Sequence, residues 1–217
     1  YGRFDEIWNK ISVLIEQKKE GKDERFIIPL TDIDRTMADL VGSKMANLGE
    51  ILNKVSLKVP AGFAITAHAY QYFINQNDLQ SEIDRRFIAT DITDMEALYA
   101  LSADIQKIII EGEIPKDLEA QILGAYDDLE REMGGPVSLA IRSSAMGEDS
   151  AANSFAGQYR SLLNVSRDFL ILSYKEIAAS KYSVPAIAYR LNKGFLDEDI
   201  VMGVGCMAMV QADTAGV

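Results

Sequence analysis

Residues 137–165 read VSLAIRSSAMGEDSAANSFAGQYRSLLNV, and the alternation at the start of this segment predicts a β-strand. Val137, Leu139 and Ile141 alternate with small or polar residues, and the last of these is Arg142. Such a period of two is typical of a strand that buries only one of its faces. We therefore expect Arg142 to stand at the end of this half-buried strand.

Two hydroxyl groups and a loop that contains glycine follow Arg142. Ser143 and Ser144 come first, residues 145–157 are mostly small or polar, and a second apolar run occupies residues 159–165. Arginine offers a planar fork of donors to phosphate oxygens, and hydroxyl and loop N–H groups can bind the remaining oxygens. The pattern therefore indicates a site for a phosphate-bearing ligand. The alternative is a hairpin with a long loop, in which Arg142 pairs with a surface carboxylate.

Two further blocks of sequence extend this pattern. The three blocks, in chain order, are VGSKMANLGEIL at 41–52 with VPAGFAITAHAY at 59–70, then IRSSA, GEDS, NSFAGQY and LLNV within 137–165, then AIAYRLNKGF at 186–195 with MGVGCMAMV at 202–210. Together they resemble the nucleotide-binding domain of the phosphoenolpyruvate synthase and pyruvate phosphate dikinase family. The resemblance covers residues 31–217.

The resemblance implies an α/β (α+β) fold of the ATP-grasp-like kind, in which two subdomains close on ATP. Residues 31–199 would form the first subdomain, with a helical layer over a mixed sheet. Residues 200–217 would begin a second subdomain that is truncated here, and residues 1–30 would be a helical lead-in or linker from an upstream region. We therefore expect the chain to be part of a longer protein.

The resemblance also implies an activity, that of an ATP-dependent phosphotransferase. Such a protein would split ATP and pass a phosphoryl group to a histidine in a missing domain, and then to pyruvate. ATP and, through the missing domains, pyruvate or phosphoenolpyruvate would be its partners, those domains could form a homodimer, and the present segment alone would be inactive. Two alternatives stay open, namely a non-catalytic nucleotide-sensing domain and a related dikinase whose acceptor is a glucan or an antibiotic.

Lys44 is the second cation that we expect at the site. It stands at the start of a helix predicted from Met45, Leu48 and Ile51, where a cation opposes the helix dipole and a bound phosphate would relieve the conflict. This segment is not a P-loop, because Ala38 stands where the first glycine would be and Met45 follows the lysine. The resemblance matches Lys44 to the phosphate-binding lysine of the family.

The resemblance assigns further residues to ATP. Lys44 and Arg142 would act catalytically by neutralising phosphate charge as it shifts during transfer. Met207 stands where many family members carry a glutamine, so a polar contact near the nucleotide is lost. Mg²⁺ would be bound by ligands downstream of Val217. The expected ATP-binding residues are Lys44, Arg142, Ser143, Ser144, Gly157, Ser161 and Met207.

Composition argues against several other functions. The 217-residue chain is 48% hydrophobic and carries a formal net charge of −11, which disfavours non-specific binding to nucleic acid or to an anionic membrane. No apolar run approaches the roughly 18 residues of a membrane span. The single cysteine, Cys206, cannot form a disulfide within the chain, so a reducing cytoplasm is the expected setting.

Hydrophobic periodicity predicts the remaining elements. Helices are expected over residues 2–20, 95–110 and 116–132, and strands over residues 137–141, 159–165 and 200–211. His68, the one histidine, is expected to be inert near the start of a surface helix. The histidine that carries phosphate in the resembling family lies in a separate domain.

Overall fold

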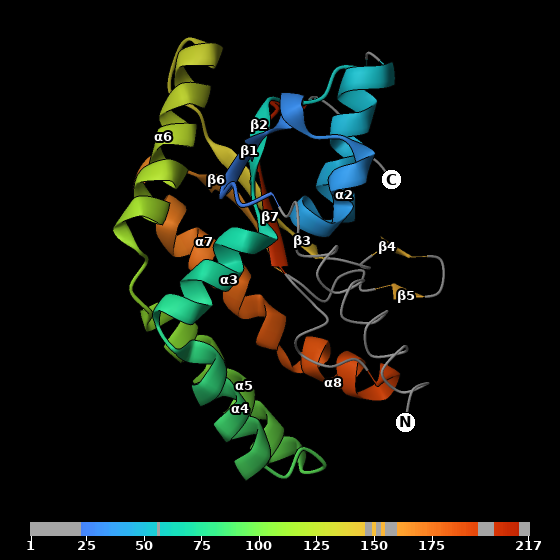
Figure 1. The fold of residues 1–217 in the computed structure, drawn as a ribbon, viewed down its shortest axis with the longest axis vertical. Coiled ribbons are helices and arrows are strands. Elements are labelled where there is room, and N and C mark those ends of the chain that lie inside the picture. The colour runs from blue at the N-terminus through green and yellow to red at the C-terminus, as the bar shows by residue number, and fades with distance from the viewer. Residues whose placement is uncertain are drawn as a thin grey trace, which may run out of the picture.

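The computed structural model describes residues 23–55, 57–145, 149–150, 153–154, 160–194 and 202–212. The helix expected over residues 2–20, and Gly157 in the loop after Arg142, lie outside the described residues. Seven α-helices of the described part pack around a five-stranded antiparallel sheet (Figure 1). The predicted α/β fold class is therefore confirmed.

The sheet has the strand order β1-β2-β7-β3-β6, and each of its four pairings is antiparallel. The mixed sheet that the resemblance implied is corrected in this respect, because no two neighbouring strands of this sheet run parallel. The strands are β1 (Ile27–Pro29), β2 (Gly62–Ile65), β3 (Leu139–Ala145), β6 (Ser161–Val165) and β7 (Met202–Ala208), and a separate pair is formed by β4 (Asp149–Ser150) and β5 (Asn153–Ser154).

Strand β3 is longer than the alternation predicts. It continues through Ser143 and Ser144 to Ala145, so Arg142 lies in the middle of the strand and not at its end. The reason is its pairing with β7, which extends from Leu139 opposite Ala208 to Ala145 opposite Met202. The pairing with β7 provides hydrogen-bonding partners for the backbone groups of Ser143 and Ser144. It therefore keeps in the strand two polar residues that local sequence alone would not keep there.

Strand β7 occupies the centre of the sheet, between β2 and β3. It pairs with β2 and with β3, and the expected subdomain boundary at residue 200 stays a prediction. Residues 202–208 therefore complete the sheet described here. Their side chains are mostly buried, as their run of apolar and small residues predicts.

Helices cover the two faces of the sheet unequally. Among the described helices, α2 packs on one face against β3 and β7, and α3, α6 and α7 pack on the other (Figure 1). The helices are α2 (Ala38–Glu50), α3 (Ala67–Gln76), α4 (Leu79–Ala89), α5 (Met95–Glu111), α6 (Lys116–Met133), α7 (Leu170–Ala179) and α8 (Val184–Lys193). None of these is long and apolar enough to cross a membrane.

Local sequence explains where several helices begin and end. The Thr66 hydroxyl accepts a hydrogen bond from Ala69 N–H at 3.1 Å and so caps α3. Asp94 accepts from Glu96 N–H at 3.0 Å and caps α5 in the same way. Pro115 precedes α6, and Gly134 ends it with a φ of 75°.

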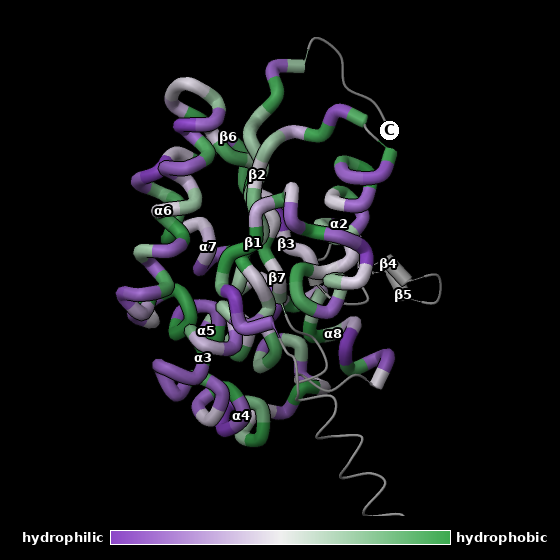
Figure 2. The backbone as a smooth tube through the Cα atoms, turned by 45° about the horizontal axis from the view of Figure 1, so that its top comes forward, coloured by the Kyte–Doolittle hydropathy of each residue, from purple (hydrophilic) through white to green (hydrophobic). Residues whose placement is uncertain are grey.

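Alternation along the strands separates two apolar clusters. The larger cluster takes Ile141 of β3 and Val204 and Cys206 of β7, together with residues of α3 to α7. The smaller cluster joins Val41 and Met45 of α2 to side chains of β1 and β2 on the opposite face. The strands are accordingly hydrophobic in Figure 2, whereas the outer turns of α4 and α6 carry many hydrophilic residues. The face on which α2 packs is the one that contains the cleft described below.

Candidate functional site

A cleft of about 390 Å³ lies between α2 and the face of β3 and β7 on which α2 packs. It is built from three segments that are far apart in the sequence, one from the helical residues 44–51, one from β3 and one from β7. The lining residues are Lys44, Met45, Asn47, Leu48, Ile51, Arg142, Ser143, Ser144, Gly205 and Met207.

Helix α2 contributes one continuous face to the cleft. Gly42 has φ 79° and ψ 159°, which interrupts the helix, so the regular turns resume just before Lys44. Lys44, Asn47, Leu48 and Ile51 then follow at spacings of three, four and seven, which places them on the same side. The cleft therefore has the positive end of a helix and a lysine at one of its edges.

The strands contribute the opposite wall. Arg142 is the cross-strand partner of Gly205, and Ser144 is the partner of Gly203. Residues in such register have their side chains on the same face of the sheet. A Cβ atom at Gly205 would lie 2.4 Å from the sulfur of Met45, so glycine at this position lets α2 approach the sheet closely. Arg142 itself is exposed, and its strand β3 is paired on both sides, with β7 and with β6.

The structure brings together most of the residues that the resemblance assigned to ATP. Lys44, Arg142, Ser144 and Met207 line the same cleft, although β3 and α2 are separated by about half of the chain. Their roles in binding ATP stay predictions, because this arrangement shows proximity alone.

Ser143 and Ser161, which the resemblance also assigns to ATP, are placed differently from these four residues. Ser143 also lines the cleft and is buried, but the alternation of β3 places its side chain on the face of Ile141, away from that of Arg142. Ser161 of β6 is the other cross-strand partner of Arg142, and it does not line the cleft. Gly205, Arg142 and Ser161 therefore form a row of cross-strand neighbours on β7, β3 and β6, which ends at the edge of the sheet.

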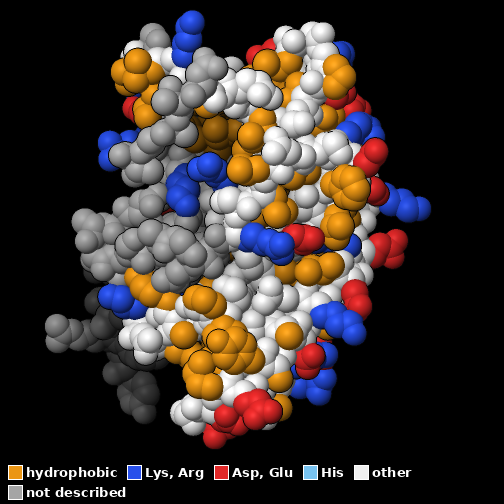
Figure 3. All heavy atoms as spheres, turned by 180° about the vertical axis from the view of Figure 1, so that it is seen from behind, with side chains coloured by type: hydrophobic (Ala, Val, Ile, Leu, Met, Phe, Trp, Pro, Cys, Tyr) orange, Lys and Arg blue, Asp and Glu red, His pale blue; other side chains and the backbone are white. Residues whose placement is uncertain are grey.

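The charge of the cleft contrasts with that of the chain. Lys44 and Arg142 are the charged residues among its described lining residues, and none of these described residues carries a carboxylate. The whole chain nevertheless has a net charge of −11, and Figure 3 shows acidic and basic side chains next to one another along one edge of the back face. The cleft is thus locally cationic, as a site for a polyanion requires.

Several lining residues were not predicted from the sequence. The sequence pattern predicts only that Asn47, Leu48 and Ile51 belong to a helix and that Gly205 belongs to a strand, whereas all four line the cleft. The spacing of the first three from Lys44 contained the signal, because it defines one face of the helix. The position of Gly205 opposite Arg142 had no such signal, since it depends on the pairing of two strands.

The described residues hold no cluster of metal ligands, and the one histidine does not line the cleft. Within the described ranges, no group of three or more His, Cys, Asp or Glu side chains could hold a metal ion. His68 lies outside the lining of the cleft and stacks on Phe26, with ring centroids 5.3 Å apart. Burial raises the pKa of the Cys206 thiol well above its ordinary value of 9.0, which disfavours the reactive thiolate.

Comparison with known proteins finds similar sequences over most of this chain. Residues 38–217 match the family model described as pyruvate phosphate dikinase, AMP/ATP-binding domain. A probable phosphoenolpyruvate synthase of Staphylothermus marinus is 36% identical over 90% of this chain and 24% of its own length.

Bacterial relatives give the same result. Phosphoenolpyruvate synthases of Neisseria meningitidis and Escherichia coli are 33% and 35% identical, over 88% and 86% of this chain. The chain covers 25% and 23% of these two proteins. It therefore spans about a quarter of the length of the curated relatives named here.

Proposed function

The chain belongs to the family of the pyruvate phosphate dikinase AMP/ATP-binding domain, and from this premise we propose that the α2–β3–β7 cleft binds the phosphates of ATP. One observation carries the proposal. Lys44 and Arg142, from distant parts of the sequence, line a cleft in which the described residues include no carboxylate.

The chemistry of the two cations supports this assignment. Arg142 can bind two phosphate oxygens at once through its guanidinium, and Lys44 adds a point charge at the start of regular helix. N–H groups in the first turn of a helix also attract anions. The phosphates would therefore lie between the start of α2 and Arg142.

An apolar wall supports the position of the base. Leu48, Ile51 and Met207 line the same cleft as the two cations. Apolar and polarizable side chains suit the faces of an aromatic ring. In our proposal Met207 packs against the nucleotide base by its thioether, in the place where a glutamine would have made a polar contact.

For the intact protein we propose a phosphotransferase that forms phosphoenolpyruvate. The names of the relatives support pyruvate or phosphoenolpyruvate as the second substrate, ahead of a glucan or an antibiotic. A histidine nitrogen outside this chain would form a bond to phosphorus while a P–O bond of ATP breaks, and the electron pair would go to the leaving phosphate oxygen. Pyruvate would then lose a methyl proton to form its enolate, and the enolate oxygen would bond to phosphorus as the N–P bond breaks and its electron pair returns to the histidine nitrogen.

Phosphoryl transfer from ATP requires Mg²⁺, which neutralises charge on the phosphates. The described lining of the cleft offers cations, hydroxyls and an amide but no carboxylate, so these residues do not form a Mg²⁺ site by themselves. We propose that its ligands lie elsewhere in the intact protein.

ATP binding by calorimetry tests the site. Lys44→Met and Arg142→Met should each weaken ATP binding about 10-fold to 100-fold, which is the value of one or two hydrogen bonds to a charged group. Lys54→Met and Arg131→Met are matched controls, because both side chains are largely exposed and pair with surface carboxylates, Glu50 and Asp128. Wild-type affinity in both cleft variants would contradict the proposal.

Kinetics of the intact phosphotransferase separate the roles of the two cations. With ATP at saturation, Arg142→Ala should still lower single-turnover phosphoryl transfer about 100-fold, because a rigidly held donor stabilises charge that develops in the transition state. Lys44→Met should weaken ground-state binding as well. An Arg142→Ala protein that melts normally and transfers phosphate at the wild-type rate would rule out the catalytic role.

A further inference from the structure

The start of α2 meets the sheet at a tight junction of three residues, Gly42, Ser144 and Gly203. A Cβ atom on Gly42 would lie 1.9 Å from the carbonyl oxygen of Ser144 and 2.3 Å from its Oγ. A Cβ atom on Gly203 would lie 2.8 Å from the carbonyl oxygen of Val41 and 3.0 Å from that of Ser144. The backbones of α2, β3 and β7 are therefore in direct contact here.

The side chain of Ser144 makes a specific bond within this junction. Its Oγ accepts a hydrogen bond of 3.3 Å from the N–H group of Met45, and the serine is 1% exposed. Met45 lies in the first turn after the break at Gly42. The first N–H groups of a helix in general have no carbonyl acceptor in a preceding turn. Ser144 thus does for this helix what an N-cap residue does, but from a strand distant in the sequence.

Ser144 also has a fixed relation to the two cations of the cleft. It lies two residues after Arg142 on the same face of β3, about 6.6–6.8 Å along the strand. Through Met45 it holds the backbone next to Lys44. The hydrogen bond therefore connects strand β3, which carries Arg142, directly to helix α2, which carries Lys44.

We propose that Ser144 is a positioning residue that sets Lys44 against Arg142, acting through the Met45 amide and not through ATP. The inference rests on the proposed function, since it assumes that both cations bind the same phosphates. It changes the role that the resemblance gave to Ser144, which was that of a direct ATP contact. Pre-orientation of a charged side chain by a buried hydrogen bond is a common way of building such sites.

A double-mutant cycle with ATP as the probe tests the proposal. Ser144→Ala should weaken ATP binding about fivefold in the wild-type background, the factor that corresponds to one helix cap. In the Lys44→Met background the same change should have no further effect, because the residue that Ser144 positions is gone. A direct ATP contact would instead weaken binding equally in both backgrounds and would overturn the proposal.

Ser102→Ala is the matched control for loss of a buried hydrogen bond. Ser102 is 4% exposed and donates to the carbonyl oxygen of Tyr182 at 2.7 Å, away from the cleft. Both alanine variants should lower stability, but only Ser144→Ala should lower the ATP affinity of the folded protein. Equal ATP affinity in the two variants would show a merely structural role and would overturn the proposal.

Two further readouts separate this proposal from the proposed function. Hydrogen exchange at the Met45 amide should speed up in Ser144→Ala and not in Ser102→Ala, with no ATP present. Unchanged exchange would overturn the positioning role alone. Wild-type ATP affinity in Lys44→Met and Arg142→Met would instead overturn the ATP site, whatever the exchange result.

Discussion

Gly42 shows at the scale of one residue why the cleft needs a particular amino acid. Its φ of 79° lies in the left-handed region that side chains disfavour, and the space where a Cβ would stand is taken by Ser144. Two independent constraints therefore select glycine. The conformation interrupts α2 and places the first N–H groups of the resumed helix at the cleft.

Gly42→Ala and Gly134→Ala distinguish these two constraints. Gly134 has a similar φ of 75° but no atom within 4 Å of its would-be Cβ. Gly134→Ala should cost about 1–2 kcal/mol from backbone strain alone, and overlap should bring the cost of Gly42→Ala to about 2–5 kcal/mol. Urea denaturation measures both, and equal losses would show that the junction with Ser144 has room to relax.

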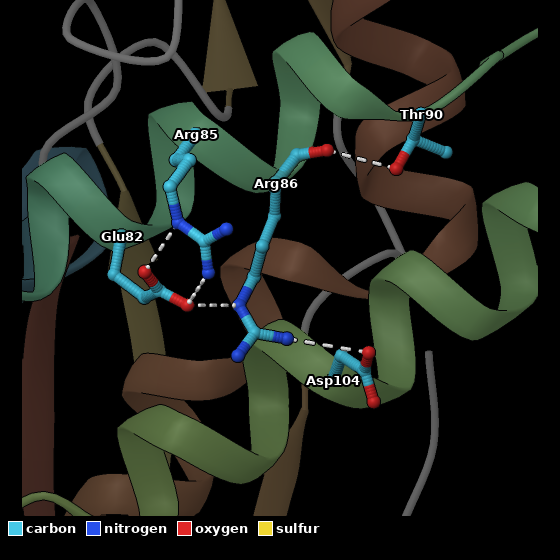
Figure 4. Close-up of polar contacts among 5 residues, drawn as sticks. All are labelled: Glu82, Arg85, Arg86, Thr90 and Asp104. Atoms are coloured by element: carbon cyan, nitrogen blue, oxygen red, sulfur yellow. Dashed lines mark hydrogen bonds and ion pairs between the residues drawn. The ribbon is translucent and has the colours of Figure 1, made fainter.

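Helices α4 and α5 show how a pair of elements is joined by charge. Glu82 of α4 accepts hydrogen bonds from Arg85 at 2.7 and 2.8 Å and from Arg86 at 2.8 Å, and Arg86 reaches Asp104 of α5 at 3.2 Å (Figure 4). The Thr90 hydroxyl donates to the carbonyl oxygen of Arg86 at the end of α4. Arg86 thus bridges Glu82 of its own helix and Asp104 of α5.

The pH dependence of stability should report on this network. Hydrogen bonds, first from Arg85 and then from Arg86, lower the pKa of Glu82 from 4.5 to about 2. A carboxylate with a lowered pKa stabilises the fold fully above its unfolded-state pKa, and this contribution disappears as the pH falls through the folded-state value. The stability difference between wild type and Glu82→Gln should therefore be largest above pH 4.5 and shrink toward pH 2.

Glu132→Gln controls for the loss of one negative charge, because Glu132 is exposed near the end of α6. Thermal melting across this pH range compares the variants. A difference between wild type and Glu82→Gln that does not depend on pH would show that the network contributes through packing and not through the charge of Glu82.

The whole molecule is organised by a sheet with two unlike faces. One face joins α3 to α7 in a large apolar cluster, and the other carries α2 and the cleft. Because successive residues of β3 point to opposite faces, Ile141 is fully buried in the large cluster while Arg142 faces the cleft. The core that stabilises the fold therefore also holds the site rigid.

Ile141→Ala should lower the free energy of unfolding by about 2–5 kcal/mol, since it deletes buried methylene groups and leaves a cavity. Leu163→Ala on the neighbouring strand β6 is the control, because that side chain is 54% exposed and its loss should cost less than about 0.5 kcal/mol. Urea denaturation followed by circular dichroism compares the two. Similar costs would mean that β3 is not central to the core.

Local periodicity determined much of the secondary structure from the sequence alone. Helices predicted over residues 95–110 and 116–132 correspond to α5 (Met95–Glu111) and α6 (Lys116–Met133). The strand predicted at 200–211 contains β7 (Met202–Ala208). These elements could be predicted because an amphipathic repeat is a property of neighbouring residues. The family resemblance likewise rested on contiguous motifs.

Only the tertiary structure decided how these segments meet. The antiparallel order of the sheet, the extension of β3 to Ala145 and the central place of β7 all follow from pairing between distant strands. The bond from Met45 to Ser144 and the row from Gly205 to Arg142 depend on the same register. No local pattern encodes such contacts, because they join residues that are distant in the sequence. They form where glycines leave no side chain between two backbones, so that these can pack closely together.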